Sequence, residues 1–295
     1  MTRSPPATDR LGQSLERAIG GHREALISLL ARGSRLPGIQ ANDALADSFA
    51  QACRALGARA DRVALDLAHL SADEAPGASA LEFLPVCGVV ALGARAAVDK
   101  SVRRRFVAEL HARADDPRFR VRDAVVTALA RVGGGAGDEL VEDVAAWMDG
   151  YFHAAAVLRG LAREEWLGTL HSAPPAIARL DEAFELALDA PRAAARYPGH
   201  KALIEALHRT PGLMALRFGV PVFDMVLRWA GVKDPVMREV PAAFVDYPKL
   251  AGRFGPDLDR VRHALDGSRP APRNPDHNVG PTRDRSGARR NKRRA

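Results

Sequence analysis

The stretch DDPRFRVRDAVVTALARV, residues 115–132, decides the fold class of this chain. A helical period runs through it, because its apolar residues recur three or four positions apart. This apolar stripe consists of Val121, Ala124, Val125, Ala128, Leu129 and Val132. Pro117 stands just before the stripe, where it removes a backbone donor and favours a turn. The stretch therefore predicts a turn at Asp116 and Pro117, followed by a helix with one buried face.

The same period recurs in residues 45–56, 140–148 and 223–230, and no segment alternates as a strand would. Proline and glycine interrupt the periodic runs and predict tight turns between short helices. These breaks include Gly20-Gly21, residues 36–38, 75–77 and 133–137, Pro174-Pro175, Pro198-Gly199, Pro211-Gly212 and Asp234-Pro235. Aspartates near such breaks lie 33 to 45 residues apart, close to the size of a two-helix hairpin. We therefore expect an all-α protein.

The composition favours closely packed helices in a reducing compartment. Apolar residues make up 47% of the chain and aromatic residues only 5%, and short side chains let helix axes approach. Cys53 and Cys87 are the two cysteines, and their spacing matches neither a disulfide framework nor a zinc motif. The N-terminal residues contain no apolar leader, and Phe83 to Gly93 is about half the ~20 residues that cross a bilayer. We expect a cytoplasmic protein that lies outside the membrane and holds no metal or cofactor.

The formal charge of +7 is concentrated at the C-terminus. Residues 268–295 contain nine Lys or Arg and two Asp, so residues 1–267 carry 34 basic and 34 acidic groups. The terminal residues are also rich in proline and glycine, a composition that cannot offset the ordering entropy of the chain. The sequence thus predicts a disordered N-terminus over residues 1–10, a helical domain over 11–267 and a disordered basic tail over 268–295.

The fold-deciding stretch resembles the second helix of a HEAT repeat, with a turn Asp, a Pro, a Val-Arg pair and an Ala/Leu stripe. Residues 234–240 carry a weaker copy. Together with residues 36–46 and 82–90, in this order, the pattern is similar to a bacterial family of HEAT-repeat proteins of uncharacterised function. The resemblance spans roughly residues 20–265 and implies an α-solenoid of HEAT-like helical hairpins, about five to six in number, with no established activity. Pro241 departs from the pattern and is expected to kink or shorten the last hairpin.

Two groups of basic residues are candidate binding sites. One lies in the body and consists of Arg103, Arg104, Arg105, Arg118, Arg120 and Arg122. It can form a site for an anionic partner, or it can form salt bridges between repeats with the remaining side chains solvated. The other lies in the tail and consists of Arg289, Arg290, Lys292, Arg293 and Arg294. It can attract nucleic-acid phosphates without sequence preference, or it can serve only to keep the chain soluble.

No residue pattern indicates catalysis. The glycines of residues 133–137 follow a helix and precede two acids, so they indicate a flexible turn and not a phosphate loop. The nine histidines match no metal-binding spacing. Some HEAT-like proteins are alkylpurine DNA glycosylases, which use exposed aromatic residues beside an Asp. Trp147, Trp166 and Trp229 would fill that role if they were exposed, but the formally neutral body argues against a DNA-binding face, and core or rim packing explains the three residues more simply.

The function best matched to these observations is a non-enzymatic binding or scaffold protein that holds a protein partner on a concave helical surface. The alternative is a nucleic-acid-directed protein, either a binder or a glycosylase-like enzyme. A lyase or chaperone for a tetrapyrrole-bearing protein is a third hypothesis, which rests on analogy of fold alone.

Overall fold

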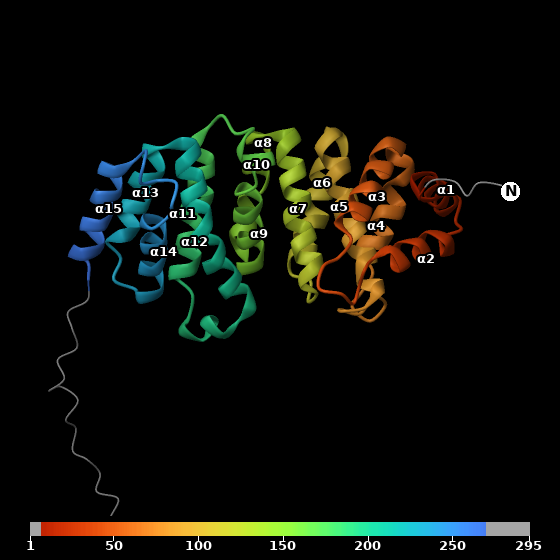
Figure 1. The fold of residues 1–295 in the computed structure, drawn as a ribbon, viewed down its shortest axis with the longest axis horizontal. Helices are drawn as coiled ribbons and strands as arrows, with labels where there is room; N and C mark the ends of the chain where they lie inside the picture. The colour runs from red at the N-terminus through yellow and green to blue at the C-terminus, as the bar shows by residue number, and fades with distance from the viewer. Residues whose placement is uncertain (1–6, 270–295) are drawn as a thin grey trace, which may run out of the picture.

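The computed structural model describes residues 7–269, and this part of the chain forms helices without any strand (Figure 1). The first half contains α1 (Ala7–Ile19), α2 (Glu24–Gly33), α3 (Asp43–Leu56), α4 (Ala58–Ala68), η1 (Ala80–Glu82), α5 (Phe83–Val98), α6 (Lys100–Ala114) and α7 (Phe119–Ala136). The second half contains α8 (Asp138–Asp143), η2 (Ala145–Asp149), α9 (Tyr151–Leu161), α10 (Glu164–Leu167), α11 (Ala173–Leu188), η3 (Arg192–Arg196), α12 (Pro198–Phe218), α13 (Val220–Ala230), α14 (Pro235–Val245) and α15 (Gly255–Gly267). The all-α prediction is confirmed for the described residues.

The domain boundaries differ slightly from those that the sequence predicts. Helix α1 begins at Ala7, inside the segment 1–10 that was expected to be disordered, and residues 1–6 lie outside the described part. Of the predicted tail, Ser268 and Arg269 are described, and residues 270–295 are outside. The Ser268 hydroxyl donates to the carbonyl of Ala230 at 2.6 Å. The folded body therefore extends at least through Ser268.

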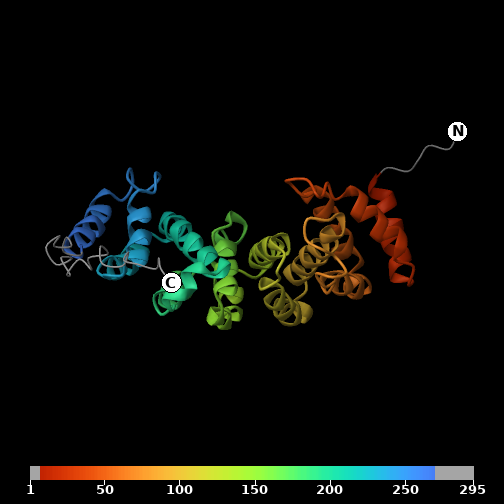
Figure 2. The same cartoon turned by 90° about the horizontal axis from the view of Figure 1, so that it is seen from below.

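The helices follow one another along the long axis of the molecule in chain order (Figures 1 and 2). Within this arrangement α3, α5, α7, α9, α12 and α14 each pack on the next, and we call them the first row. The remaining longer helices flank this row: α4 and α6 pack on α5, α11 packs on α9 and α12, and α13 packs on α12 and α14. Most packing thus joins elements that are close in sequence.

Helix α5 is the most completely buried element, because α3, α4, α6 and α7 all pack on it. Its residues from Phe83 to Ala96 are all buried. The helical run Ala80–Val98 is long and apolar enough to cross a membrane, and it is longer than the apolar stretch Phe83 to Gly93 that the sequence indicates. However, 83% of its apolar 18-residue window is buried inside the protein. Cys53 on α3 and Cys87 on α5 are both buried free thiols, and burial raises the pKa of Cys53 to about 12.

One predicted turn is shorter than expected, and another is instead part of a helix. Helix α7 continues through Gly133, and only Gly137, with a φ of +56°, marks its end. A Cβ at Gly133 would lie 2.0 Å from Cγ of Trp166, so this glycine makes room for the indole. Pro211 and Gly212 lie buried inside α12. The predicted break at residues 133–137 is thus confirmed only at Gly137, and the predicted break at Pro211-Gly212 is wrong. Close packing of neighbouring side chains requires a glycine at Gly133 and Gly212 and overrides its low helix propensity.

The two stretches that resemble a HEAT repeat, which begin at Asp115 and at Asp234, each lead into the start of a helix. Asp234 caps α14 by accepting hydrogen bonds from the backbone amides of Val236 and Met237, both at 3.0 Å. Pro241 lies inside α14, which continues to Val245, so this proline does not end the helix. Asp116 and Pro117 form the predicted turn before α7. Asp116 is nevertheless buried and accepts a 2.8 Å bond from the amide of Arg118.

Replacement of Gly133 by alanine should destabilise the protein, because the added methyl group would overlap the Trp166 ring. Overpacking of this kind costs about 1–3 kcal/mol of unfolding free energy. Urea denaturation followed by circular dichroism measures the change. Gly12→Ala in α1 is the matched control, since its Cβ meets no described atom within 4 Å, and it should leave stability equal or slightly higher. Equal stability of the two variants would contradict the packing argument.

Candidate anion-binding groove

Three adjoining cavities lie along the first row of helices and form one groove. Their volumes are about 510, 410 and 300 Å³. Arg159 of α9 lines all three, Arg163 lines the first two, and Glu205 of α12 lines the first and third. We call this continuous surface the groove. It extends from the α2–α3 connection, at Ile39, to Tyr247 after α14.

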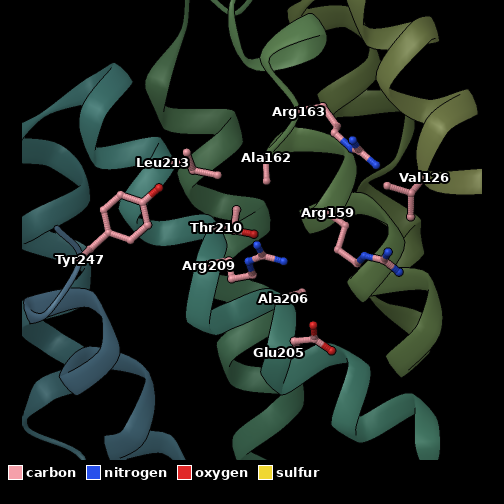
Figure 3. A pocket seen from close by; sticks show the side chains of 10 residues that line it. All are labelled: Val126, Arg159, Ala162, Arg163, Glu205, Ala206, Arg209, Thr210, Leu213 and Tyr247. Atoms are coloured by element: carbon pink, nitrogen blue, oxygen red, sulfur yellow. The ribbon is translucent and has the colours of Figure 1, made fainter. Parts of the chain in front are cut away.

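Helical spacing places the arginines of the groove. On α9 the residues from His153 to Leu158 are buried, whereas Arg159 is exposed, and Arg163 follows one turn later at the start of α10. On α12 the buried Ala206, Leu207 and Thr210 leave Arg209 facing outward. Because α9 packs on α12, Arg159, Arg163 and Arg209 line a single cavity (Figure 3).

The groove carries an excess of positive charge although the body as a whole is formally neutral. Its basic residues are Arg120, Arg122, Arg131, Arg159, Arg163, Lys201 and Arg209, and its acids are Asp43, Asp47, Asp123 and Glu205. Arg131 pairs with Asp47, and Arg159 pairs with Asp123 at 2.9 Å. Among the ion pairs of residues 7–269, such as Arg159 with Asp123 and Arg179 with Glu182, none includes Arg163 or Arg209. A concave surface with unpaired guanidinium groups attracts anions.

Apolar residues stand beside these charges. Ile39 is 96% exposed and Phe119 is 52% exposed, and both line the cavity at the N-terminal end of the groove. The Arg120 guanidinium lies over the Phe119 ring, 4.5 Å from its centroid. At the other end Leu213 and the half-buried Tyr247 face the basic centre (Figure 3). The groove can therefore contact apolar and anionic parts of one ligand.

Two arginines that the sequence offers as binding residues are committed to internal partners. Arg103 is buried, donates to the carbonyl of Ala96 at 3.1 Å and pairs with Glu139 at 2.8 Å. Arg118 is buried, pairs with Asp116 at 2.7 Å and donates to the carbonyls of Leu70, Ser71 and Ala75. For these two residues the structure matches the salt-bridge alternative and not the anion-site alternative.

The other sequence candidates are scattered. Arg120 lines the groove while pairing with Glu82 at 3.0 Å, and Arg122 lines its third cavity with the guanidinium 4.3 Å from the centroid of the Phe152 ring. Arg104 lines a separate cavity with His111 and Trp147. The expected arginine cluster of the body is therefore not one surface. The tail candidates Arg289, Arg290, Lys292, Arg293 and Arg294 lie outside the described residues.

The sequence analysis did not single out Arg159, Arg163 or Arg209. They are isolated arginines, separated by up to 50 residues in an arginine-rich chain. The one available signal is that Arg159 directly follows the apolar run of residues 154–158. A charged residue in such a helix is expected to face the solvent. That signal does not distinguish a groove from any other helix surface.

The tryptophan-based glycosylase hypothesis is wrong in its structural premise. Trp147, Trp166 and Trp229 have exposed fractions of only 3%, 0% and 8%. The Trp166 indole donates to the carbonyl of Gly137 at 3.2 Å, and the Trp229 indole donates to Asp181 at 2.6 Å. All three rings therefore serve core packing, and a flipped base would find no exposed tryptophan to stack on.

The groove itself offers no metal centre within the described residues. In that part of the chain, the group of His, Cys, Asp and Glu side chains close enough to hold an ion is His111, Asp149 and His153, and none of these residues lines the three groove cavities.

Comparison with known proteins adds no assignment: no protein-family model matches the chain, and no curated protein matches its sequence.

The buried Asp116–Arg118 pair predicts a pH-dependent contribution to stability. Burial raises the pKa of Asp116, but hydrogen bonds and charge from Arg118 outweigh it and hold the pKa below its ordinary 3.8. Asp116→Asn leaves Arg118 without its counter-charge and should cost about 3–5 kcal/mol at pH 7. A carboxylate with a lowered pKa stabilises the fold above its ordinary pKa and loses this contribution as the pH falls below it. The difference in unfolding free energy between the wild type and the Asp116→Asn variant should therefore become smaller below pH ~4.

Urea denaturation at pH 7, 5, 4 and 3 tests this expectation. Asp73→Asn is the control, because Asp73 is exposed in the α4–η1 connection near the same contacts, and it should change stability by less than about 0.5 kcal/mol. A wild-type advantage over Asp116→Asn that stayed constant down to pH 3 would contradict the assigned charge state of Asp116.

Proposed function

We propose that this chain is an α-solenoid of HEAT-like helical hairpins and that it acts as a binding or scaffold protein. Its ligand is an extended, acidic segment of a protein partner, held in the groove. The observation that supports this most is the juxtaposition of Arg159, Arg163 and Arg209 in one cavity of about 510 Å³. Arg159 pairs with Asp123, but Arg163 and Arg209 form no ion pair among the described residues and favour a ligand that brings its own carboxylates.

The packing pattern supports the solenoid part of the proposal. In a solenoid each hairpin contacts its neighbours and the equivalent helices line one surface. Here the first-row helices pack one on the next from α3 to α14, and helices between them pack on the flank. The groove residues come from that row and its connections, which is where a solenoid presents an extended binding surface.

The charge pattern of the groove favours a polypeptide over a nucleic acid. Four acids line the groove together with its seven basic residues, and Asp47 and Asp123 already pair with Arg131 and Arg159. A phosphate at every nucleotide would meet these acids, whereas a peptide can place carboxylates beside Arg163 and Arg209 only. The exposed Ile39 and Phe119 additionally suit apolar side chains of a peptide. Nucleic-acid binding through the basic tail is the alternative.

Fluorescence anisotropy with a labelled twelve-residue peptide of alternating Glu and Leu tests the proposal on the full chain. The double variant Arg163→Glu with Arg209→Glu should weaken binding by about tenfold or more, because two attractive contacts become repulsive. Arg62→Glu on α4 is the control, since Arg62 has an 87% exposed side chain and does not line the groove, and it should leave the affinity unchanged. The same peptide with Lys in place of Glu should not bind.

Single-stranded DNA serves as the competing ligand. A full-length variant with Gln at Arg289, Arg290, Lys292, Arg293 and Arg294 separates the tail from the groove. If DNA binds more tightly than the acidic peptide and the groove double variant abolishes that binding, the groove is a nucleic-acid surface and the proposal fails. Loss of DNA binding only in the tail variant, with peptide binding intact, agrees with it.

A further inference from the structure

A cluster of two histidines and an aspartate lies outside the groove, at the junction of α6, η2 and α9. His111 comes from α6, Asp149 ends η2, and His153 belongs to the first turn of α9. Asp149 lies 2.8 Å from Nδ1 of His153 and 3.1 Å from Nε2 of His111. One nitrogen of each imidazole and one carboxylate oxygen all lie within 4.8 Å of one another. Three metal-ligating groups therefore already face a common point.

Neighbouring groups hold both imidazoles in place. The two rings are 3.8 Å apart between centroids, and the buried Trp147 contacts His111 edge-on at 5.0 Å. Nε2 of His153 lies 3.5 Å from a carboxylate oxygen of Asp115. A carboxylate on the far nitrogen of a histidine is the usual outer partner of a metal-bound imidazole, because it fixes the orientation of the ring and increases its basicity.

The surroundings leave the cluster open and negatively charged. The Asp149 side chain is 52% exposed, and with His111 it lines a cavity of about 480 Å³. Asp143 and Arg104 line the same cavity, so with Asp115 the neighbourhood holds three carboxylates and one guanidinium when both histidines are neutral. His153 itself is buried, and a Cβ at Gly150 would lie 2.8 Å from its Nδ1, so only a glycine fits beside that nitrogen without crowding it.

We propose that this cluster binds a divalent transition-metal ion, Zn²⁺ in the first place. The ligands are Nε2 of His111, Nδ1 of His153 and a carboxylate oxygen of Asp149, and Asp115 orients His153. Two imidazoles and one carboxylate form a donor set that suits zinc better than calcium or magnesium. Three protein ligands leave a fourth position, which faces the cavity beside Arg104. The site does not depend on the proposed peptide function.

Isothermal titration of the full chain with ZnCl₂ tests the proposal, and Mg²⁺ at the same concentrations serves as the comparison ion. We expect one Zn²⁺ per chain and an increase in the thermal midpoint on zinc addition, because a ligand of the folded state stabilises it. When Co²⁺ is bound in place of Zn²⁺, its visible absorption bands report the coordination of the metal directly. Mg²⁺ should give neither binding heat nor stabilisation.

The variants separate a metal site from a hydrogen-bonded cluster with a purely structural role. Asp115→Asn should weaken Zn²⁺ binding by about 10–100-fold, and His111→Gln and Asp149→Asn should weaken it further. Asp149 is half exposed, so its variant keeps the fold testable by circular dichroism. His69→Gln is the control, because His69 forms an exposed pair with Glu109 and should leave the affinity unchanged. Absence of Zn²⁺ binding, or binding that His111→Gln and Asp149→Asn leave intact, would overturn the proposal.

Discussion

Helix α5 is buried on all sides, and its neighbours α3, α4, α6 and α7 are held in place by packing on it. Every other helix of the N-terminal half contacts α5 directly, or contacts a helix that does. Such burial requires small residues where the helix axes cross. A Cβ at Gly88 would lie 2.3 Å from the amide nitrogen of Ala68, and one at Gly93 would lie 2.5 Å from Cα of Ala128. The buried Arg95 near the end of α5 is tolerated because Asp61 and Asp99 both accept hydrogen bonds from it.

The same close packing builds the groove. Once α5 fixes α7, helix α9 packs on α7 and α12 packs on α9, so the solvent-facing sides of successive first-row helices lie next to one another. Residues with no relation in sequence, such as Arg131 and Asp47, become ion-pair partners across this surface. Arg163 and Arg209 remain without such partners among the described residues, so the centre of the groove holds guanidinium groups that can attract an anion.

Helix α9 connects the groove with the histidine cluster. Arg159 lines the groove and His153 belongs to the cluster. The two residues are six positions apart, which rotates one about 240° from the other around the helix. A short helix can therefore present one face to a peptide and another to a metal ion. Because the two proposed sites use different side chains, each can be altered without removing a residue of the other.

The helical class, several helix starts and the apolar identity of the core could be predicted from the amino-acid sequence alone. These follow from the 3.6-residue period and from proline and aspartate at helix starts, which are local effects. Gly133 and Pro211-Gly212, where breaks were predicted, are helical because a neighbouring ring occupies the space that the glycine leaves, and α7 ends only at Gly137. Local propensity does not include that neighbour.

The candidate sites were decided almost wholly by the tertiary structure. Of the predicted body arginines, Arg103 and Arg118 turned inward, and the arginines at the centre of the groove were not distinguished in the sequence. His111 and His153 are 42 residues apart and match no local spacing, yet the packing of α6 on α9 brings the centroids of their rings to 3.8 Å. Charge and ligand type are properties of the sequence. Their convergence on one point depends on which helix faces meet, and side-chain packing between distant segments sets that geometry.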